Sequence, residues 1–176
     1  MRRTVSTALV ALLSMMLLGL PPQLAPAAAS APGPRAAGWV WPVDGPRVVD
    51  RPFLAPAQPW APGHRGVDLQ TPAVGAEVRA VMAGVIHFAG VVVDRPVVTV
   101  RDGQLLATVE PVEPIVAEGD RVAAGQVIGR LLPGHCASAP RVAPCVHLGV
   151  RLAGEYVSPL LYLGGLQRAV LLPLTP

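Results

Sequence analysis

The sequence predicts an all-β domain, an antiparallel sandwich or barrel of two sheets, and two observations carry this prediction. The apolar segments are short, rich in valine and separated by Gly, Pro and Asp, which is the pattern of strands joined by tight turns. After the first thirty residues, no stretch shows a convincing helical period. The 176-residue chain is 52% hydrophobic and only 14% charged, so it has ample material for one core and is not a disordered chain.

Six segments are expected to be strands: 77–80, 84–88, 97–100, 105–109, 126–131 and 146–151. Alternation of apolar and polar residues is clearest from Val97 to Arg101. The Asp102-Gly103 pair that follows is a strong signal for a β-hairpin. We therefore expect the third and fourth segments to pair directly with each other.

The first thirty residues predict a signal peptide. Arg2 and Arg3 precede an apolar run over residues 8–20, and a small-residue stretch follows over residues 25–30. The run is shorter than the roughly 20 residues that cross a bilayer as a helix, so we expect a cleaved leader, no stable membrane span after cleavage and a secreted protein. The expected organisation is a signal peptide (1–30), a linker (31–38), one domain (39–163) and a C-terminal tail (164–176).

The composition excludes several function classes. Every one of the 14 cationic side chains is arginine, so chemistry that requires a lysine is absent: Schiff-base catalysis, P-loop phosphate binding and attachment of biotin or lipoate. The net charge of +3 falls to +1 when Arg2 and Arg3 leave with the leader. Such a small and scattered excess gives no electrostatic footprint for a nucleic acid, so none is expected as a partner.

His64 and Asp68 are the first candidates for a metal site. Fully extended, residues 64–68 would separate the two side chains by about 13 Å, too far to bind one ion. Gly66 lies between them and would allow the chain to bend, so that both could reach the ~2.0 to 2.2 Å that zinc requires. The alternative is a loop histidine beside an aspartate that caps a turn.

The other three histidines lie further along the chain. His147 belongs to an alternating segment, on the same face as Cys145 and opposite an apolar face, where it is either a ligand or a surface residue. His87 is expected at an ordinary exposed strand position. His135 is expected in a loop, from which it could line a cleft.

Export would place Cys136 and Cys145 in an oxidising compartment, where we expect them to form a disulfide that closes a short loop. An alternative has Cys145 bind a metal together with His147, His64 and Asp68. That arrangement would be a closed, structural site.

The segment Gly63-His64-Arg65-Gly66-Val67-Asp68 resembles the HxxxD motif of the lysostaphin-type, LytM-like zinc endopeptidases, which cut peptide cross-links in bacterial peptidoglycan. The resemblance continues through residues 75–90 and 119–129, the segment around His147, and Tyr156-Val157-Ser158-Pro159-Leu160, so that it covers roughly residues 39–163. It implies a two-sheet β fold of the duplicated hybrid motif type, with zinc in an open groove.

By position, the resemblance implies that His64, Asp68 and His147 bind zinc and leave a fourth place for water, as in catalytic zinc sites. The family also has two helper histidines that assist proton transfer and stabilise the oxyanion. Neither is present: the first falls at Glu110 or Pro111, and the second falls on Cys145. Losing one positioned acid–base group typically costs about 10² to 10⁴ in rate.

Two functions follow from the resemblance. The first is an exported zinc metalloendopeptidase that acts on peptidoglycan cross-link peptides in the extracellular cell-wall space, with Glu110 or His135 as conceivable substitutes for the missing groups. The second is a non-catalytic, zinc-containing wall-binding module that recruits or activates a partner hydrolase. Intact ligand positions favour the first, and the missing helper histidines favour the second.

Overall fold

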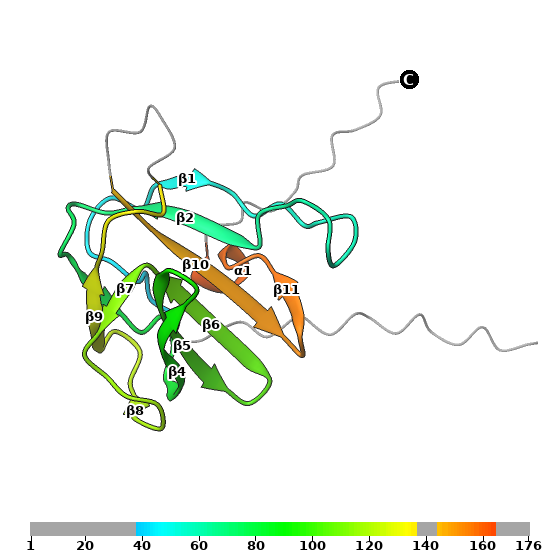
Figure 1. Cartoon of the computed structure of the whole chain (residues 1–176). Helices are drawn as coiled ribbons and strands as arrows, with labels where there is room; N and C mark the ends of the chain where they lie inside the picture. The colour runs from blue at the N-terminus through cyan, green and yellow to red at the C-terminus, as the bar shows by residue number, and fades with distance from the viewer. Residues whose placement is uncertain (1–37, 137–143, 165–176) are drawn as a thin grey trace, which may run out of the picture. The chain divides into compact units, whose positions relative to one another are not determined.

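The computed structural model describes residues 38–136 and 144–164, which are almost entirely β structure (Figure 1). The expected signal peptide, nearly all of the linker and nearly all of the tail lie outside the described residues. Among the described residues, no helix has both the length and the apolar character needed to cross a membrane.

Two antiparallel sheets make up the fold. The larger has eight strands, ordered β1 (Val49–Arg51), β2 (Gly66–Gln70), β10 (Cys145–Leu152), β6 (Leu105–Glu110), β5 (Arg95–Asp102), β4 (Gly84–Val92) and β8 (Arg121–Val122), with β11 (Glu155–Val157) paired to β10. The smaller has three, ordered β3 (Glu77–Arg79), β9 (Val127–Leu131) and β7 (Val112–Pro114). One short helix, α1 (Leu160–Leu163), follows β11. The predicted all-β, antiparallel two-sheet architecture is confirmed.

All six predicted strands are present, as β3, β4, β5, β6, β9 and β10. The hairpin predicted at Asp102-Gly103 joins β5 to β6, and Gly103 takes the left-handed conformation (φ 57°) that such a turn favours. Thr99 and Thr108 face each other across this hairpin, with their hydroxyl oxygens 2.9 Å apart.

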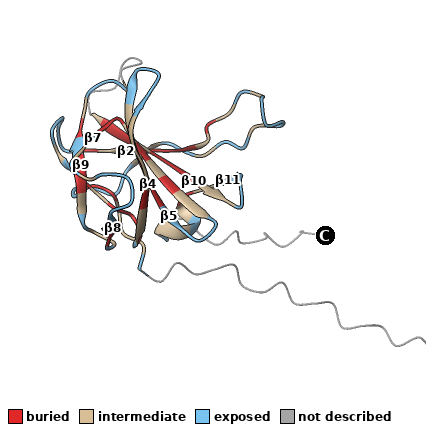
Figure 2. Ribbon diagram, turned by 60° about the horizontal axis from the view of Figure 1, so that its bottom comes forward, coloured by how far each residue is buried: buried red, intermediate tan, exposed pale blue. Residues whose placement is uncertain are grey.

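Both sheets contribute to one hydrophobic core. Val146, Leu148 and Val150 of β10 are fully buried, and they cluster with residues of the smaller sheet that include Ile128 and Leu131. Buried residues follow the central strands in Figure 2. Burial of this apolar face fixes which way β10 is turned, because successive side chains of a strand point to opposite faces. His147 therefore points away from the core.

The register of three neighbouring strands positions the candidate site. His147 of β10 pairs with Asp68 of β2 on one side and with Glu110 of β6 on the other. Directly paired residues project from the same face of a sheet, so these three side chains share one row across the strands. The connection between β1 and β2, residues 52–65, projects from the sheet as a long loop and delivers His64 to the start of β2 (Figure 1).

Candidate metal centre

The structure brings His64, Asp68 and His147 together. The Oδ1 atom of Asp68 lies 2.8 Å from Nδ1 of His147 and 3.0 Å from Nε2 of His64. The two histidine nitrogens are 3.2 Å apart. Three atoms at these separations suit one small cation, because ligands about 2.0 to 2.2 Å from a tetrahedral zinc ion lie at similar distances from one another.

The chain bends at Arg65, one residue before the expected position Gly66, which is already the first residue of β2. Two backbone hydrogen bonds of 2.9 Å, between His64 and Leu54, hold the residue just before the bend. The spacing of His64 and Asp68 predicted a bend between them. The bend is present, but it lies at the end of the loop formed by residues 52–65 and not at Gly66. Gly66 serves the site in a different way, through its contact with His147.

The protonation state of His64 is the one that a metal-binding histidine requires. Its Nδ1 donates a 2.8 Å hydrogen bond to the carbonyl oxygen of Pro52, as the second nitrogen of a metal-binding histidine usually does. Burial lowers the pKa of His64, so the neutral ring is favoured and Nε2 carries a lone pair. That lone pair faces the carboxylate of Asp68, which is also an acceptor. A cation between the two acceptors would satisfy both, and zinc therefore fits this donor set.

Asp68 is ionised at the centre of the cluster. Burial alone would raise the pKa of Asp68, but the hydrogen bonds from His135 and His147 outweigh burial and hold the pKa well below its usual range. The side chain is almost inaccessible, with 4% of its surface exposed. A buried carboxylate surrounded by imidazole nitrogens is the negative partner that a divalent cation needs.

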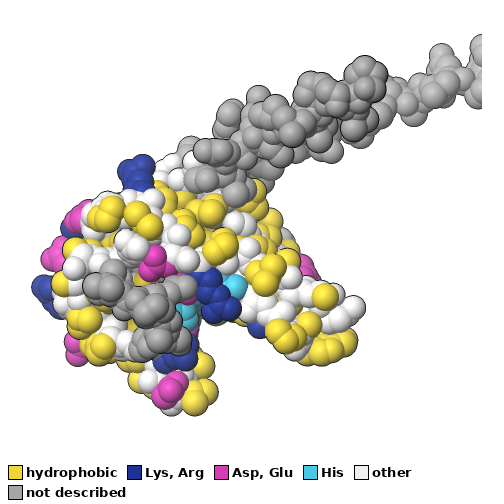
Figure 3. Space-filling model, turned by 90° about the horizontal axis from the view of Figure 1, so that it is seen from above, with side chains coloured by type: hydrophobic (Ala, Val, Ile, Leu, Met, Phe, Trp, Pro, Cys, Tyr) yellow, Lys and Arg dark blue, Asp and Glu magenta, His cyan; other side chains and the backbone are white. Residues whose placement is uncertain are grey.

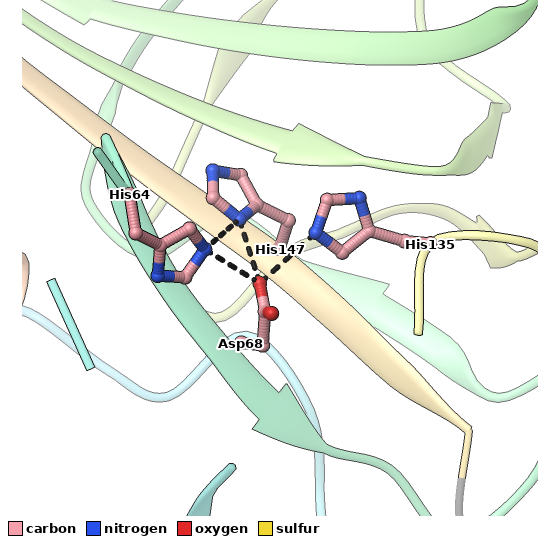
Figure 4. Close-up of side chains that lie close together, drawn as sticks. All are labelled: His64, Asp68, His135 and His147. Atoms are coloured by element: carbon pink, nitrogen blue, oxygen red, sulfur yellow. Dashed lines mark hydrogen bonds and ion pairs between the residues drawn. The ribbon is translucent and has the colours of Figure 1, made fainter. Parts of the chain in front are cut away.

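His135 is the fourth member of the cluster. Its Nε2 lies 3.0 Å from Oδ1 of Asp68, and one ligand atom from each of His64, Asp68, His135 and His147 lies within 4.8 Å of the others (Figure 4). The sequence predicted His135 in a loop, from which it could line a cleft or substitute for a missing helper histidine. The structure brings it from the end of the described segment 38–136 to the side of Asp68.

Cys136 and Cys145 form the expected disulfide. They are the only two cysteines of the chain, and neither is free. The alternative in which Cys145 binds a metal is therefore wrong, because a disulfide sulfur is no thiolate.

Glu110, one of the two residues at which the first helper position falls, borders the cluster. Its Oε1 accepts a 3.3 Å hydrogen bond from Nη1 of Arg95 and lies 3.4 Å from Nδ1 of His135. The hydrogen bond with His135 lowers the pKa of Glu110 despite partial burial. Glu110 is therefore an ionised neighbour of His135, and it is separated from Asp68 by the width of an imidazole ring.

A groove of about 490 Å³ opens beside the cluster and is lined by residues that include His147, Glu110, Arg65, Arg151 and Tyr156. His87 also lines it, on strand β4 as expected, but it is half-buried, so the expected exposed position was wrong. Figure 3 shows histidine and arginine side chains gathered beside a hollow in this face. The arrangement places a candidate metal site at the wall of an open groove, because His147 belongs to both.

Comparisons with known proteins show similarity in sequence and in fold. Residues 62–159 match the sequence model of Peptidase family M23. The "Uncharacterized protein Rv2891" of Mycobacterium tuberculosis is 39% identical over 125 residues, which are 68% of this chain and 49% of the relative, so the chain spans about half the length of the curated relatives it matches.

Two solved structures share the fold. Csd3 of Helicobacter pylori has a TM-score of 0.56 and 25% identity, over 75% of this chain and 34% of Csd3. A putative peptidase M23 from Pseudomonas aeruginosa has a TM-score of 0.52 and 26% identity, over 72% of this chain and 52% of the other.

Proposed function

Because the chain belongs to peptidase family M23, we propose that it is an exported zinc metalloendopeptidase that cuts the cross-link peptides of bacterial peptidoglycan. The observation that carries this proposal is the meeting of His64, Asp68 and His147 at pairwise distances of 2.8 to 3.2 Å beside an open groove. The residue types, their order in the chain and their approach all suit a catalytic zinc site.

The residues of the chain have distinct roles in this function. His64 and His147 would bind zinc through Nε2 and Nδ1, and Asp68 through Oδ1. Zinc in such a site polarises the scissile carbonyl and activates water for attack. The carbonyl of Pro52 keeps the His64 ring in the orientation and tautomer that binding requires. The groove would hold the peptide with its scissile bond beside His147.

The absence of histidines at the two helper positions favours a second function. The family resemblance implies histidines at Glu110 or Pro111 and at Cys145, and a disulfide cysteine moves no protons. We therefore keep as the alternative a non-catalytic zinc module that binds the wall and recruits or activates a partner hydrolase. This module would keep the metal and the groove but cut no peptide.

Export is part of the proposal and is supported by the sequence of residues 1–30. Secretion would also supply the oxidising environment in which the disulfide between Cys136 and Cys145 persists. Expression of the 176-residue chain in a bacterial host, with mass spectrometry of the cell-free medium, would detect a protein shortened by about thirty residues if a leader of the usual length is removed.

One experiment separates the two functions. The purified protein is analysed for metal and incubated with peptidoglycan, and the released fragments are sequenced by mass spectrometry for new amino termini. The proposed enzyme contains about one zinc per chain and releases peptides, whereas His147→Ala loses both properties. A zinc-loaded protein that releases no peptide at any pH but remains on sedimented cell walls would support the alternative.

A further inference from the structure

One residue of the disulfide, Cys145, lies at the position of the second missing helper histidine. Cys145 lies on β10 two residues before His147, at the position where the family resemblance implies the second helper histidine. Its sulfur is bonded to Cys136, whose neighbour along the chain is His135. Cys145 therefore replaces a histidine on β10 and, through its disulfide to Cys136, holds His135 close to the same strand.

The His135 ring is held at both edges. Nε2 lies 3.0 Å from Oδ1 of Asp68, while Nδ1 lies 3.3 Å from Nη1 of Arg95 and 3.4 Å from Oε1 of Glu110. The side chain has only 13% of its surface exposed, and its ring centre is 4.7 Å from that of His147. These contacts fix the ring against the cluster even though it belongs to a loop.

The hydrogen-bond partner of His135 Nε2 determines whether this nitrogen is a donor or an acceptor. A carboxylate oxygen accepts hydrogen bonds, so Nε2 of His135 carries the hydrogen in its 3.0 Å contact with Oδ1 of Asp68. This nitrogen faces Oδ1 of Asp68, the atom on which the contacts from His64 and His147 also converge (Figure 4). A peptide carbonyl activated at that point would lie within reach of the same donor.

We propose that His135 is the helper histidine of this protein, supplied from a loop by the disulfide between Cys136 and Cys145, and that its Nε2 donates a hydrogen bond to the scissile carbonyl oxygen as negative charge develops there. Arg95 and Glu110 act as positioning residues, because they contact the opposite edge of the ring. This inference rests on the proposed peptidase function, and it explains how a chain without either family histidine keeps a donor at the reaction centre.

The first test is His135→Ala in the full chain, with zinc content and steady-state kinetics on a peptidoglycan peptide as readouts. If His135 is a donor and not a zinc ligand, the variant should still bind about one zinc when zinc is in excess, with an affinity lowered by at most the roughly 10- to 100-fold typical of an outer-shell partner. The value of kcat should fall by about 10² to 10³, as it does when one oxyanion donor is removed.

The second test moves the histidine back to the strand. Cys136→Ser combined with Cys145→Ser removes the tether and should lower kcat nearly as much as His135→Ala, with zinc content kept. Cys136→Ser combined with Cys145→His restores a histidine two residues before His147, and it should recover most of kcat and make His135→Ala tolerable. A purely structural role of the disulfide would not be rescued in this way, and thermal unfolding of each variant shows whether the fold is retained.

Three outcomes would overturn the inference. If His135→Ala abolishes zinc binding as completely as His64→Ala, then His135 is a fourth ligand that closes the site. If the wild type cuts peptides and His135→Ala cuts them equally well, this inference alone is wrong and the proposed peptidase remains. If the wild type binds zinc and cuts nothing, the proposed peptidase function is wrong, and the helper role of His135 falls with it.

Discussion

The imidazole of His147 lies directly over the α-carbon of Gly66 on the neighbouring strand. A methyl group built on Gly66 would approach to 2.5 Å from Nε2 of His147 and would also collide with the carbonyl oxygen of Leu148. The carbonyl is backbone and cannot turn aside without disturbing the pairing of β2 with β10. The absence of a side chain at Gly66 thus creates the space that the ligand ring occupies.

Gly66→Ala should therefore damage both the fold and the metal site. We expect a loss of about 1 to 3 kcal/mol in the free energy of unfolding, as for other overpacked positions, and a weaker affinity for zinc because His147 is displaced. Urea unfolding and a zinc competition assay measure the two effects. The matched control is Gly149→Ala, on the residue paired with Gly66, where a methyl group would come no closer than 3.4 Å to any atom. Equal losses in the two variants would contradict this account.

Asp68→Asn tests the charge at the centre of the site. The amide keeps the size of the side chain but removes the negative charge that three imidazole rings approach. Because a ligand should matter more than an outer-shell partner, we expect zinc affinity to fall by at least about 100-fold. Competition with a chromogenic chelator measures it, with Asp102→Asn at the exposed hairpin as the control. Unchanged affinity would exclude Asp68 as a ligand.

The fold was predictable where a strand is long enough to show a pattern. Alternation and turn residues are visible in β4, β5, β6 and β10, which have six to nine residues each. Five strands lie outside the six expected segments. Four of them, β1, β7, β8 and β11, have two or three residues, over which a pattern of period two cannot be recognised. These four form because longer neighbours offer them hydrogen bonds. The fifth, β2, has five residues and directly follows the loop that carries His64.

The site was predictable only in part, for a similar reason. The spacing of His64 and Asp68 and the alternation around His147 are local signals, and the family resemblance joined them into one ligand set. His135 carries no local signal, because a loop residue reaches the cluster only through tertiary structure. Its position next to Cys136 was the available clue, since a disulfide to Cys145 necessarily brings the two segments together.

The metal-free protein should lose stability in mildly alkaline solution. Hydrogen bonds to Asp68 and Glu110 raise the pKa of His135 from 6.5 to about 9 in the folded chain. The charged ring of His135 therefore makes its full contribution to the free energy of unfolding below pH 6.5, and this contribution disappears as the pH rises through about 9. The pKa values of Asp68 and Glu110 are lowered, so both stay ionised across this window.

Thermal unfolding in the presence of a chelator, at several pH values between 6.5 and 9, measures this effect. The melting temperature should decline across the range in the wild type. His135→Gln, which has no titrating ring at this position, should show a flatter profile. A wild type that is equally stable throughout, or a variant with the same decline, would show that the pair formed by His135 and Asp68 does not control stability.

Two guanidinium groups give the groove a preference for negative charge. Arg65 and Arg151 each lie 5.7 Å from the ring centre of Tyr156, and all three residues line the groove next to His147. Arg65 also donates hydrogen bonds to the carbonyls of Pro59 and Ala61, which leaves Arg151 with fewer polar contacts inside the protein. We therefore expect Arg151 to bind a free carboxylate of the peptide substrate.

Arg151→Gln should raise KM by about tenfold or more for a cross-link peptide with a free carboxylate, which corresponds to one charge-assisted hydrogen bond, and should leave kcat nearly unchanged because the contact lies away from the reacting carbonyl. For the same peptide with its carboxylates amidated, wild type and variant should have similar KM values. The control is Arg101→Gln, an exposed arginine of β5 outside this groove. A wild type that cuts both peptides equally well would show that the arginines hold the walls of the groove and do not select the substrate.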